Sequence, residues 1–348
     1  MPQVAQQVRQ VIFRRKRQST ETLRFYSQLF SVAINIWIGV QFYLWVRYIE
    51  SGATTTPIER PPGVEGWLPI SSLVSLRDWW HTGSINAVHP AGLVIFLVIL
   101  ATAFLFKKGF CGWICPVGFL SERIGDFGEG LLKHRLTPPR WLDWPLRSLK
   151  YILFGLFFYA VFIAMSPEAV TGFLYTDYNM VADVLMLRFF TDISMLALIV
   201  LVVLVALSIV VRGFWCRYLC PYGALLGLAG LVSPTRIKRV ESSCTSCSAC
   251  TIACPSRIKV EKRAEVVSDE CIGCMACVDV CPARKTLEIK TVSKRWTISP
   301  RAWALSLLIF FWGSLFAAKM WGPWQNGIPT DKYVQMMPGV KSGAYRHP

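Results

Sequence analysis

Residues 244 to 282 read CTSCSACTIACPSRIKVEKRAEVVSDECIGCMACVDVCP, and they are the most informative part of this 348-residue chain. The motif C-x2-C-x2-C-x3-C-P occurs twice in this stretch. A gap of two residues lets the chain turn and present three sulfurs to one side, while the longer last step points the fourth sulfur elsewhere. The spacing therefore predicts thiolates that surround metal clusters.

Bacterial ferredoxins bind two [4Fe–4S] clusters through the same doubled spacing, and the fourth cysteine of each motif ligates the other cluster. We therefore expect each cluster to take three ligands from one motif and one from the other. The first cluster is assigned Cys244, Cys247, Cys250 and Cys281, and the second Cys271, Cys274, Cys277 and Cys254. This exchange would join residues 236–292 into one small domain.

Two other uses of these cysteines are disfavoured. Structural zinc sites also use four cysteines, but zinc ribbons need neither the third two-residue gap nor the final proline. Disulfides are disfavoured because the segment is expected on the cytoplasmic side, where thiols stay reduced. Small residues beside the ligands, such as Ser246 and Gly273, let backbone N–H groups approach cluster sulfides.

A shorter motif also occurs twice. FCGWICPVGFL (110–120) and WCRYLCPYGAL (215–225) share C-x3-C-P-x-G-x-L, and duplication of a unit of two membrane spans plus motif explains both copies. The prolines predict that helices begin after them, at about 116–132 and 221–232. The remaining cysteines all lie in these motifs: Cys111, Cys115, Cys216 and Cys220.

We interpret these four cysteines as redox thiols or as ligands of an additional metal centre. A thiolate before a helix is stabilised by the helix dipole and by nearby cations, here Lys107, Lys108, Arg212 and Arg217. Inert buried cysteines are the alternative, but two matched pairs argue against it. If the repeats converge, four sulfurs could hold a metal or shuttle between dithiol and disulfide, and the sequence does not choose between these two.

The composition indicates a membrane protein, because 53% of the residues are hydrophobic and 17% are charged. Five apolar stretches approach the roughly 20 residues needed to cross a bilayer: 25–46, 88–106, 149–166, 193–211 and 301–318. The predicted fold class is an all-α polytopic membrane protein of about five transmembrane helices with an inserted α+β 2[4Fe–4S] ferredoxin domain. Its expected parts are a basic N-terminus (1–24), a membrane domain (25–235), the ferredoxin domain (236–292), and a last span with an outer tail (293–348).

The net charge of +16 does not indicate nucleic acid, because the basic residues gather beside the apolar stretches. Cytoplasmic loops carry such an excess of lysine and arginine. Arg14–Arg17 and the segments after the second and fourth spans are therefore expected inside, and the loops 47–87 and 167–192 outside. The leader is interpreted as an uncleaved anchor. We expect a multi-pass protein of the bacterial inner membrane with a cytoplasmic ferredoxin domain and no nucleic-acid partner.

Four spans, a C-x3-C-P motif after the second and the fourth, and two ferredoxin motifs together resemble the NapH-type membrane polyferredoxins of periplasmic nitrate reduction. The likeness covers about residues 25–295. The same core is similar to the C-terminal half of NosR and, more loosely, to the CcoG assembly proteins. The resemblance implies electron transfer between the quinol pool and redox partner proteins. The long loop after the first span and the fifth span depart from the NapH pattern, so nitrate is not implied.

The resemblance leaves more than one function open. The first is an electron-transfer subunit of a quinol-linked oxidoreductase, whose basic ferredoxin segment would dock an acidic protein such as a flavodoxin or ferredoxin. The second is a maturation or regulatory factor that supplies electrons for metalloenzyme assembly or reactivation. A third, a redox sensor, would show no steady electron flow.

Other cofactors are not expected. The histidines are His81, His89, His134 and His347, so no pair lies within the spans to ligate haem, and no C-x-x-C-H occurs. Ser51–Thr56 is similar to the SGAT-x-T sequence that carries FMN in Rnf and NqrC subunits, but a polar turn explains it better and flavin is unlikely. Around Trp67–Trp80 we expect an interfacial segment, with a quinone-headgroup site near His81 and His89 as the alternative.

Overall fold

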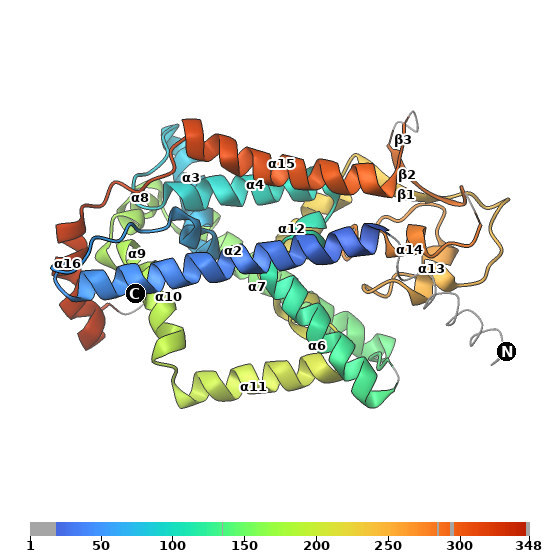
Figure 1. Ribbon diagram of the computed structural model, residues 1–348, viewed down its shortest axis with the longest axis horizontal. Coiled ribbons are helices and arrows are strands. Elements are labelled where there is room, and N and C mark those ends of the chain that lie inside the picture. Colours follow the sequence, from blue (N-terminus) through green and yellow to red (C-terminus); the bar gives the residue numbers. More distant parts are fainter. Residues whose placement is uncertain (1–18, 134, 284, 293–295, 346–348) are drawn as a thin grey trace.

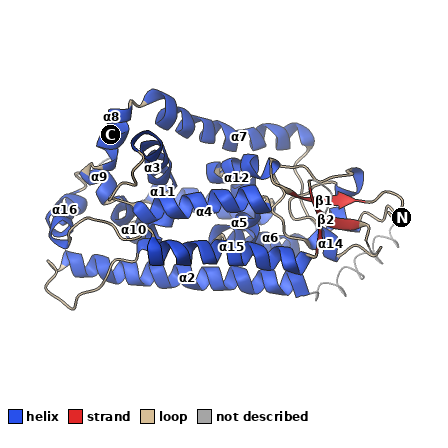
Figure 2. Ribbon diagram, turned by 90° about the horizontal axis from the view of Figure 1, so that it is seen from above, coloured by secondary structure: helices blue, strands red, loops and turns tan. Residues whose placement is uncertain are grey.

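The computed structural model describes residues 19–133, 135–283, 285–292 and 296–345. The basic segment Arg14–Arg17, His134 and His347 lie outside these residues, as do Lys294 and Arg295. The described chain is mostly helical, with a short three-stranded sheet near one end of the molecule (Figures 1 and 2).

The α-helices of ten or more residues are α2 (Ser19–Glu50), α3 (Pro69–Thr82), α4 (Pro90–Phe106), α6 (Pro116–Leu132), α7 (Arg140–Tyr159), α10 (Ala182–Thr191), α11 (Met195–Val210), α12 (Pro221–Leu231), α15 (Pro300–Trp321) and α16 (Thr330–Ser342). Short α-helices are α5 (Gly109–Trp113), α8 (Pro167–Leu174), α9 (Asp177–Met180), α13 (Ala249–Ile252) and α14 (Ala276–Asp279). The other turns are 3-10 helices η1 (Pro62–Trp67) and η4 (Val260–Lys262) and π-helices η2 (Ala160–Ala164) and η3 (Trp215–Leu219).

Helices α2, α4 and α15 lie side by side along the length of the molecule (Figures 1 and 2). Helix α12 packs on α4 and α7, and α6 packs on α11. The ferredoxin segment with its sheet lies at one end of this bundle, and α3, α8, α9, α10 and α16 lie at the other (Figure 1). The two ends are therefore separated by the length of the long helices.

Each of the five predicted spans coincides with a helix. Among the described residues, three helices are long and apolar enough to cross a membrane: Thr20–Glu50, Arg140–Ala164 and Pro300–Trp321. Helices α10 and α11, bent by 79° at their junction, make a fourth if they count as one span. Helix α4 is apolar but has only 17 residues, so it is shorter than the other candidates.

Local sequence explains where these helices begin. Proline is the first residue of α4, α6, α12 and α15, where its missing N–H costs no hydrogen bond. Ser194 and Ser299 cap α11 and α15 by accepting hydrogen bonds from Ala197 N and Ala302 N. The helices predicted after the two C-x3-C-P motifs, at 116–132 and 221–232, are confirmed within one residue.

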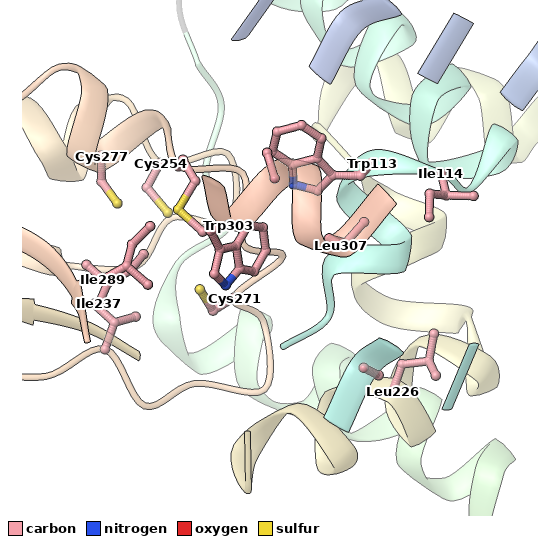
Figure 3. Close-up of a cluster of buried hydrophobic side chains, with 14 of the residues drawn as sticks. Trp113, Ile114, Leu226, Ile237, Cys254, Cys271, Cys277, Ile289, Trp303 and Leu307 are labelled. Atoms are coloured by element: carbon pink, nitrogen blue, oxygen red, sulfur yellow. The ribbon is translucent and has the colours of Figure 1, made fainter. Parts of the chain in front are cut away.

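The sheet of the ferredoxin segment is antiparallel, in the order β1 (Thr235–Arg239), β2 (Leu287–Thr291), β3 (Thr297–Ile298). Ile237 and Ile289 pair across β1 and β2 and are buried. They belong to a hydrophobic core that also contains Trp113, Leu226 and Trp303 from α5, α12 and α15 (Figure 3). One core therefore runs from the ferredoxin segment into the membrane part, and the division predicted at residue 236 stays a prediction.

At the opposite end, α3 covers most of the expected interfacial segment, whose interfacial position stays a prediction. It packs on α4 and α8 and buries its polar face, and Thr171 Oγ1 donates to Asp78 at 2.6 Å. Trp80 on its other face is 80% exposed. The inner face of α3 therefore packs against the protein, and its tryptophan face is free to contact a membrane surface.

Candidate functional site

The eight cysteines of the ferredoxin segment line two small pockets. The Cys244 pocket is lined by Cys244, Cys247, Cys250 and Cys281. The Cys271 pocket is lined by Cys254, Cys271, Cys274 and Cys277. Each pocket takes three cysteines from one motif and one from the other, which is the arrangement that exchanged ligands need. The assignment of a cluster to each pocket stays a prediction.

The backbone around both pockets has the same unusual conformation. The residues before and after the second cysteine of each motif have positive φ angles: Ser246 and Ser248 at 53° and 57°, Gly273 and Met275 at 59° and 62°. Left-handed backbone costs a non-glycine residue about 1–3 kcal/mol, so it persists only where the surroundings demand it. Such turns aim N–H groups into a concave site that binds anions.

The two pockets differ in burial. Three of the four cysteines are partly exposed in the Cys244 pocket, whereas three of the four are buried in the Cys271 pocket. Hydrogen bonds from the Ser246 backbone and the Arg239 side chain lower the pKa of Cys244. Burial raises the pKa of Cys274 to about 12. The Cys244 pocket therefore faces solvent, and the Cys271 pocket faces the membrane part.

The donor set fits iron–sulfur clusters. Such clusters are held by four thiolates, each pocket offers four cysteines, and none of the twelve cysteines, all described, is in a disulfide. A single zinc ion would draw its four sulfurs to about 2.3 Å from one point. No three His, Cys, Asp or Glu side chains of the described residues are close enough to share one ion, whereas each thiolate of a cubane binds a different iron.

The other four cysteines come together in one cavity of about 820 Å³. We call it the thiol cavity, and its cysteines are Cys111, Cys115, Cys216 and Cys220. Cys115 and Cys220 are the N-cap residues of α6 and α12, and Gly223 N–H donates to Cys220 Sγ at 3.2 Å. The two repeats, far apart in the sequence, thus converge on one site.

The glycine of each C-x3-C-P-x-G motif packs against the first cysteine of its motif. A Cβ on Gly118 would lie 2.3 Å from the Cys111 carbonyl oxygen, well inside contact distance. A Cβ on Gly223 would lie 3.5 Å from the Cys216 carbonyl oxygen and from Cys220 Sγ. The glycine therefore lets the loop fold back over the start of the helix.

A buried lysine lies beside these thiols. Lys108 is 4% exposed, and its Nζ would lie 3.5 Å from a Cβ on Gly223. Burial alone would lower the pKa of Lys108, but Glu270 and the thiols of the cavity raise it above its usual value.

Burial makes two of these thiols harder to ionise. It raises the pKa of Cys111 to about 12 and that of Cys216 to about 11. Burial therefore opposes the helix dipoles and cations that we expected to favour thiolates here, and that expectation stays a prediction. A bound metal would favour the deprotonated thiols.

The thiol cavity and the Cys271 pocket share a wall. The residues that line both are Pro255, Ser256 and Ile272. Trp113 Nε1 donates to the Gly273 carbonyl oxygen at 2.9 Å, and Trp303 packs over the same glycine. The ferredoxin loop is thus seated directly on the first C-x3-C-P motif.

Ion pairs hold the same loop to α7. Asp269 and Glu270 precede Cys271, and Arg147 lies 3.1 Å and 3.3 Å from their carboxylates. Lys150, fully buried, contacts Glu270. In the sequence, these residues stand out only as a basic loop and, far along the chain, two acidic residues beside a cysteine.

Polar residues at the start of α2 make contacts that sequence reasoning missed. Arg24 Nε donates to the Gly112 carbonyl oxygen at 2.8 Å, and Gln28 Nε2 donates to the same oxygen at 3.0 Å. Ser27 Oγ donates to the Trp113 carbonyl oxygen at 2.8 Å. Helix α2 therefore holds the loop between Cys111 and Cys115.

The two histidines in the described part of the chain, His81 and His89, do not form a common site. His81 is exposed on α3, whereas His89 is 1% exposed and its Nε2 lies 2.7 Å from the Asn179 carbonyl oxygen. Neither residue lines the thiol cavity. The alternative of a quinone-headgroup site near both histidines therefore has no support from their placement.

Comparisons with known proteins agree with this geometry. A family model described as a 4Fe-4S binding domain matches residues 88–135 and 193–239, once for each C-x3-C-P repeat. A model described as a 4Fe-4S dicluster domain matches residues 236–282. The putative electron transport protein YccM of Escherichia coli (strain K12) is 41% identical over 324 residues, which cover 91% of this chain and 90% of YccM. The chain belongs to the NapH-type family of ferredoxin-type membrane proteins.

Two further relatives align with part of the chain. The ferredoxin-type protein NapH of Haemophilus influenzae is 26% identical over 188 residues, 54% of this chain and 59% of NapH. The regulatory protein NosR of Stutzerimonas stutzeri is 28% identical over 146 residues, 40% of this chain and 19% of NosR. No solved structure matches the chain. This NapH-type chain is a mostly helical membrane protein with a ferredoxin segment, and it carries electrons through iron–sulfur clusters, as predicted.

Proposed function

We propose that this protein is the electron-transfer subunit of a quinol-linked oxidoreductase in the bacterial inner membrane. Electrons would pass between the quinol pool and a redox partner protein through two [4Fe–4S] clusters and the paired C-x3-C-P cysteines. The observation that carries the proposal is the thiol cavity, which shares a wall with the Cys271 pocket and extends between the apolar helices α2 and α15.

The two cysteine sets are proposed as the cluster ligands. The Cys244 pocket would hold one cluster through Cys244, Cys247, Cys250 and Cys281, and the Cys271 pocket the other through Cys254, Cys271, Cys274 and Cys277. When bound, each cluster takes up and releases electrons singly. The burial of the two pockets gives the order: the Cys271 set faces the thiol cavity, and the Cys244 set faces solvent.

The thiol cavity suits a quinol. Its volume falls within the roughly 300–1,000 Å³ of small-molecule sites, which are mostly apolar with a few polar groups. Its long wall is apolar, with Ile34 and Ile38 from α2 and Leu315 from α15. Lys108 and Tyr222 lie at the thiol end. Oxidation of a hydroquinone releases two electrons and two protons, so the ring belongs at this polar end and the isoprenoid tail along the apolar wall.

The partner would dock at the solvent-facing end. The described ferredoxin segment is rich in basic residues: Arg236, Lys238, Arg239, Lys259, Lys262, Arg263 and Lys290. This charge favours an acidic protein such as a flavodoxin or a soluble ferredoxin, and by the positive-inside rule it favours the cytoplasmic side.

A substitution that fills the cavity tests the proposal. We expect Ile34→Trp to slow cluster reduction by quinol at least about tenfold, because the larger ring occupies the tail site, and tenfold corresponds to about 1.4 kcal/mol. The measurement is the rate at which a quinol reduces the clusters of the purified protein in lipid nanodiscs, followed anaerobically by absorbance and EPR.

The matched control is Ile36→Trp on the same helix, where the isoleucine is 63% exposed. It should leave the quinol rate unchanged, and dithionite should reduce the clusters of both variants equally. If quinol reduces the wild type no faster than it reduces Ile34→Trp, the cavity is not the quinol site.

One comparison favours a second function. NosR, a relative over 40% of this chain, is described as a regulatory protein, which fits a factor that supplies electrons for metalloenzyme assembly or reactivation. Steady quinol turnover with a partner present supports the first function. Cluster reduction without turnover, needed only while a target enzyme is being made, supports the second.

A further inference from the structure

The thiol cavity collects four cysteines that no ferredoxin cluster uses. Cys111 and Cys115 enter it from α5 and the start of α6, and Cys216 and Cys220 from η3 and the start of α12. The two halves match, because each has a proline-started helix and a glycine that lies against the first cysteine. Each repeat therefore contributes two thiols in equivalent positions to one site.

Groups suited to a thiolate centre surround these cysteines. Gly223 N–H already donates to Cys220 Sγ at 3.2 Å, as backbone amides do to ligand sulfurs in iron–sulfur proteins. Ser121 is 8% exposed and lines the cavity, and its hydroxyl is directed to the Cys216 thiol. A hydroxyl at this position can donate to a ligand sulfur, as the Gly223 amide does.

The positive charge of Lys108 also favours a negatively charged group in the cavity. Lys108 is 4% exposed, and no carboxylate of the described residues lies within 4.0 Å of its Nζ. The Glu270 carboxylate stabilises the charged form of Lys108 from beyond ion-pair distance, and a buried cation gains more from a counter-charge in direct contact. Four thiolates around iron and sulfide carry net negative charge, which would compensate Lys108 from inside the cavity.

The thiols of the cavity are spread in the same way as those of the two ferredoxin sets. No three His, Cys, Asp or Glu side chains of the described part of the chain are close enough to share one metal ion. This holds for the cysteines of the thiol cavity and equally for the two ferredoxin sets. A centre with several irons gives each thiolate its own metal, and Cys₄ sets bind both [2Fe–2S] and [4Fe–4S] clusters.

We propose that the thiol cavity binds a third iron–sulfur cluster, with Cys111, Cys115, Cys216 and Cys220 as its ligands. The thiol cavity borders the Cys271 pocket, and Pro255, Ser256 and Ile272 line both. The role of the third cluster as a relay rests on the proposed function, but its presence does not.

The test is iron and acid-labile sulfide per chain in the full-length protein purified anaerobically, together with EPR of the reduced sample. Two cubanes account for about eight irons. We expect about ten irons with a [2Fe–2S] centre or about twelve with a [4Fe–4S] centre. The double variant Cys115→Ser, Cys220→Ser should fall to about eight irons and keep the EPR signals of both ferredoxin clusters.

Cys274→Ser is the matched control, because it removes a ligand of the Cys271 pocket and should lose iron there while keeping the signal of the third centre. About eight irons in the wild type, or zinc or copper in place of the extra iron, overturns the inference, and this result does not depend on any variant folding.

Lys108→Met with all cysteines intact should shift the potential of the third centre downward, and Lys108→Arg should restore it. Quinol assays on the same samples separate the two proposals: extra iron without quinol oxidation removes only the quinol function, and quinol oxidation with about eight irons removes only the third cluster.

Discussion

Glycine stands three residues after the second cysteine of both C-x3-C-P motifs, and at Gly118 the reason is steric. The Cys111 carbonyl oxygen occupies the place of a side chain there, 2.3 Å from where a Cβ would be. The loop between Cys111 and Cys115 can fold over the start of α6 only because that place is empty. Gly130, near the other end of the same helix, has no atom within 4 Å of its Cβ position.

We expect Gly118→Ala to lower the free energy of unfolding by about 1–3 kcal/mol, because a methyl group at this site forces the backbone to move. Gly130→Ala should leave stability unchanged or raise it slightly, by up to about 1 kcal/mol, as alanine is the better helix former. Thermal unfolding in detergent with iron content before and after heating checks both. Equal melting temperatures for the two variants would show that the contact at Gly118 is tolerated.

At the scale of the element, the first turns of α2 determine the position of the first C-x3-C-P loop. Arg24 is 6% exposed and joins the Gly112 carbonyl oxygen to Glu122 of α6, which Arg212 also contacts at 3.4 Å. One arginine thus connects three segments: α2, α5 and α6. By contrast, Arg47 at the far end of α2 is 67% exposed in its side chain and pairs only with Glu50.

We expect Arg24→Met to cost about 3 kcal/mol of stability, because it breaks a buried ion pair and removes a donor from a buried carbonyl. Arg47→Met should cost less than about 1 kcal/mol, since exposed pairs contribute little. Denaturant unfolding of both variants measures the difference. The cavity cysteines should also react faster with a small maleimide in Arg24→Met than in Arg47→Met, and equal rates would rule out a role for α2 in holding the loop.

At the scale of the whole molecule, the two ends are held together by different means. The ferredoxin end shares a hydrophobic core with α4, α5, α12 and α15. The opposite end is tied by Arg60, which pairs with Glu65 at 2.7 Å and with Asp183 at 2.6 Å across 123 residues of sequence. Figure 1 shows α16 at this end and the sheet at the other, so the membrane would lie between them.

This arrangement predicts the accessibility of the two ends in intact cells. We expect Ser342→Cys, at the exposed last position of α16, to react with a membrane-impermeant thiol reagent added outside, after the outer membrane is opened. Ser242→Cys, exposed in the ferredoxin segment, should react only after the inner membrane is broken. The reverse pattern would place the ferredoxin segment outside and contradict the proposed orientation.

The sequence alone determined those features that depend on neighbours along the chain. Cysteine spacing predicted the chemistry of the ligands, proline predicted the first residues of α6 and α12, and apolar length placed a helix at every expected span. The internal duplication was also evident, because the two C-x3-C-P motifs match residue by residue. Each of these signals is local, so no packing needs to be known to recognise it.

Only the tertiary structure decided what these pieces do together. It brought Cys111 and Cys216 into one cavity, placed Lys108 beside them, and seated Ile272 on the wall they share with the Cys271 pocket. It also showed that polar residues at the start of α2, Arg24 and Gln28, hold the loop of a distant motif. These contacts join residues about 90 to 160 positions apart, and they depend on how helices pack, which no local pattern encodes.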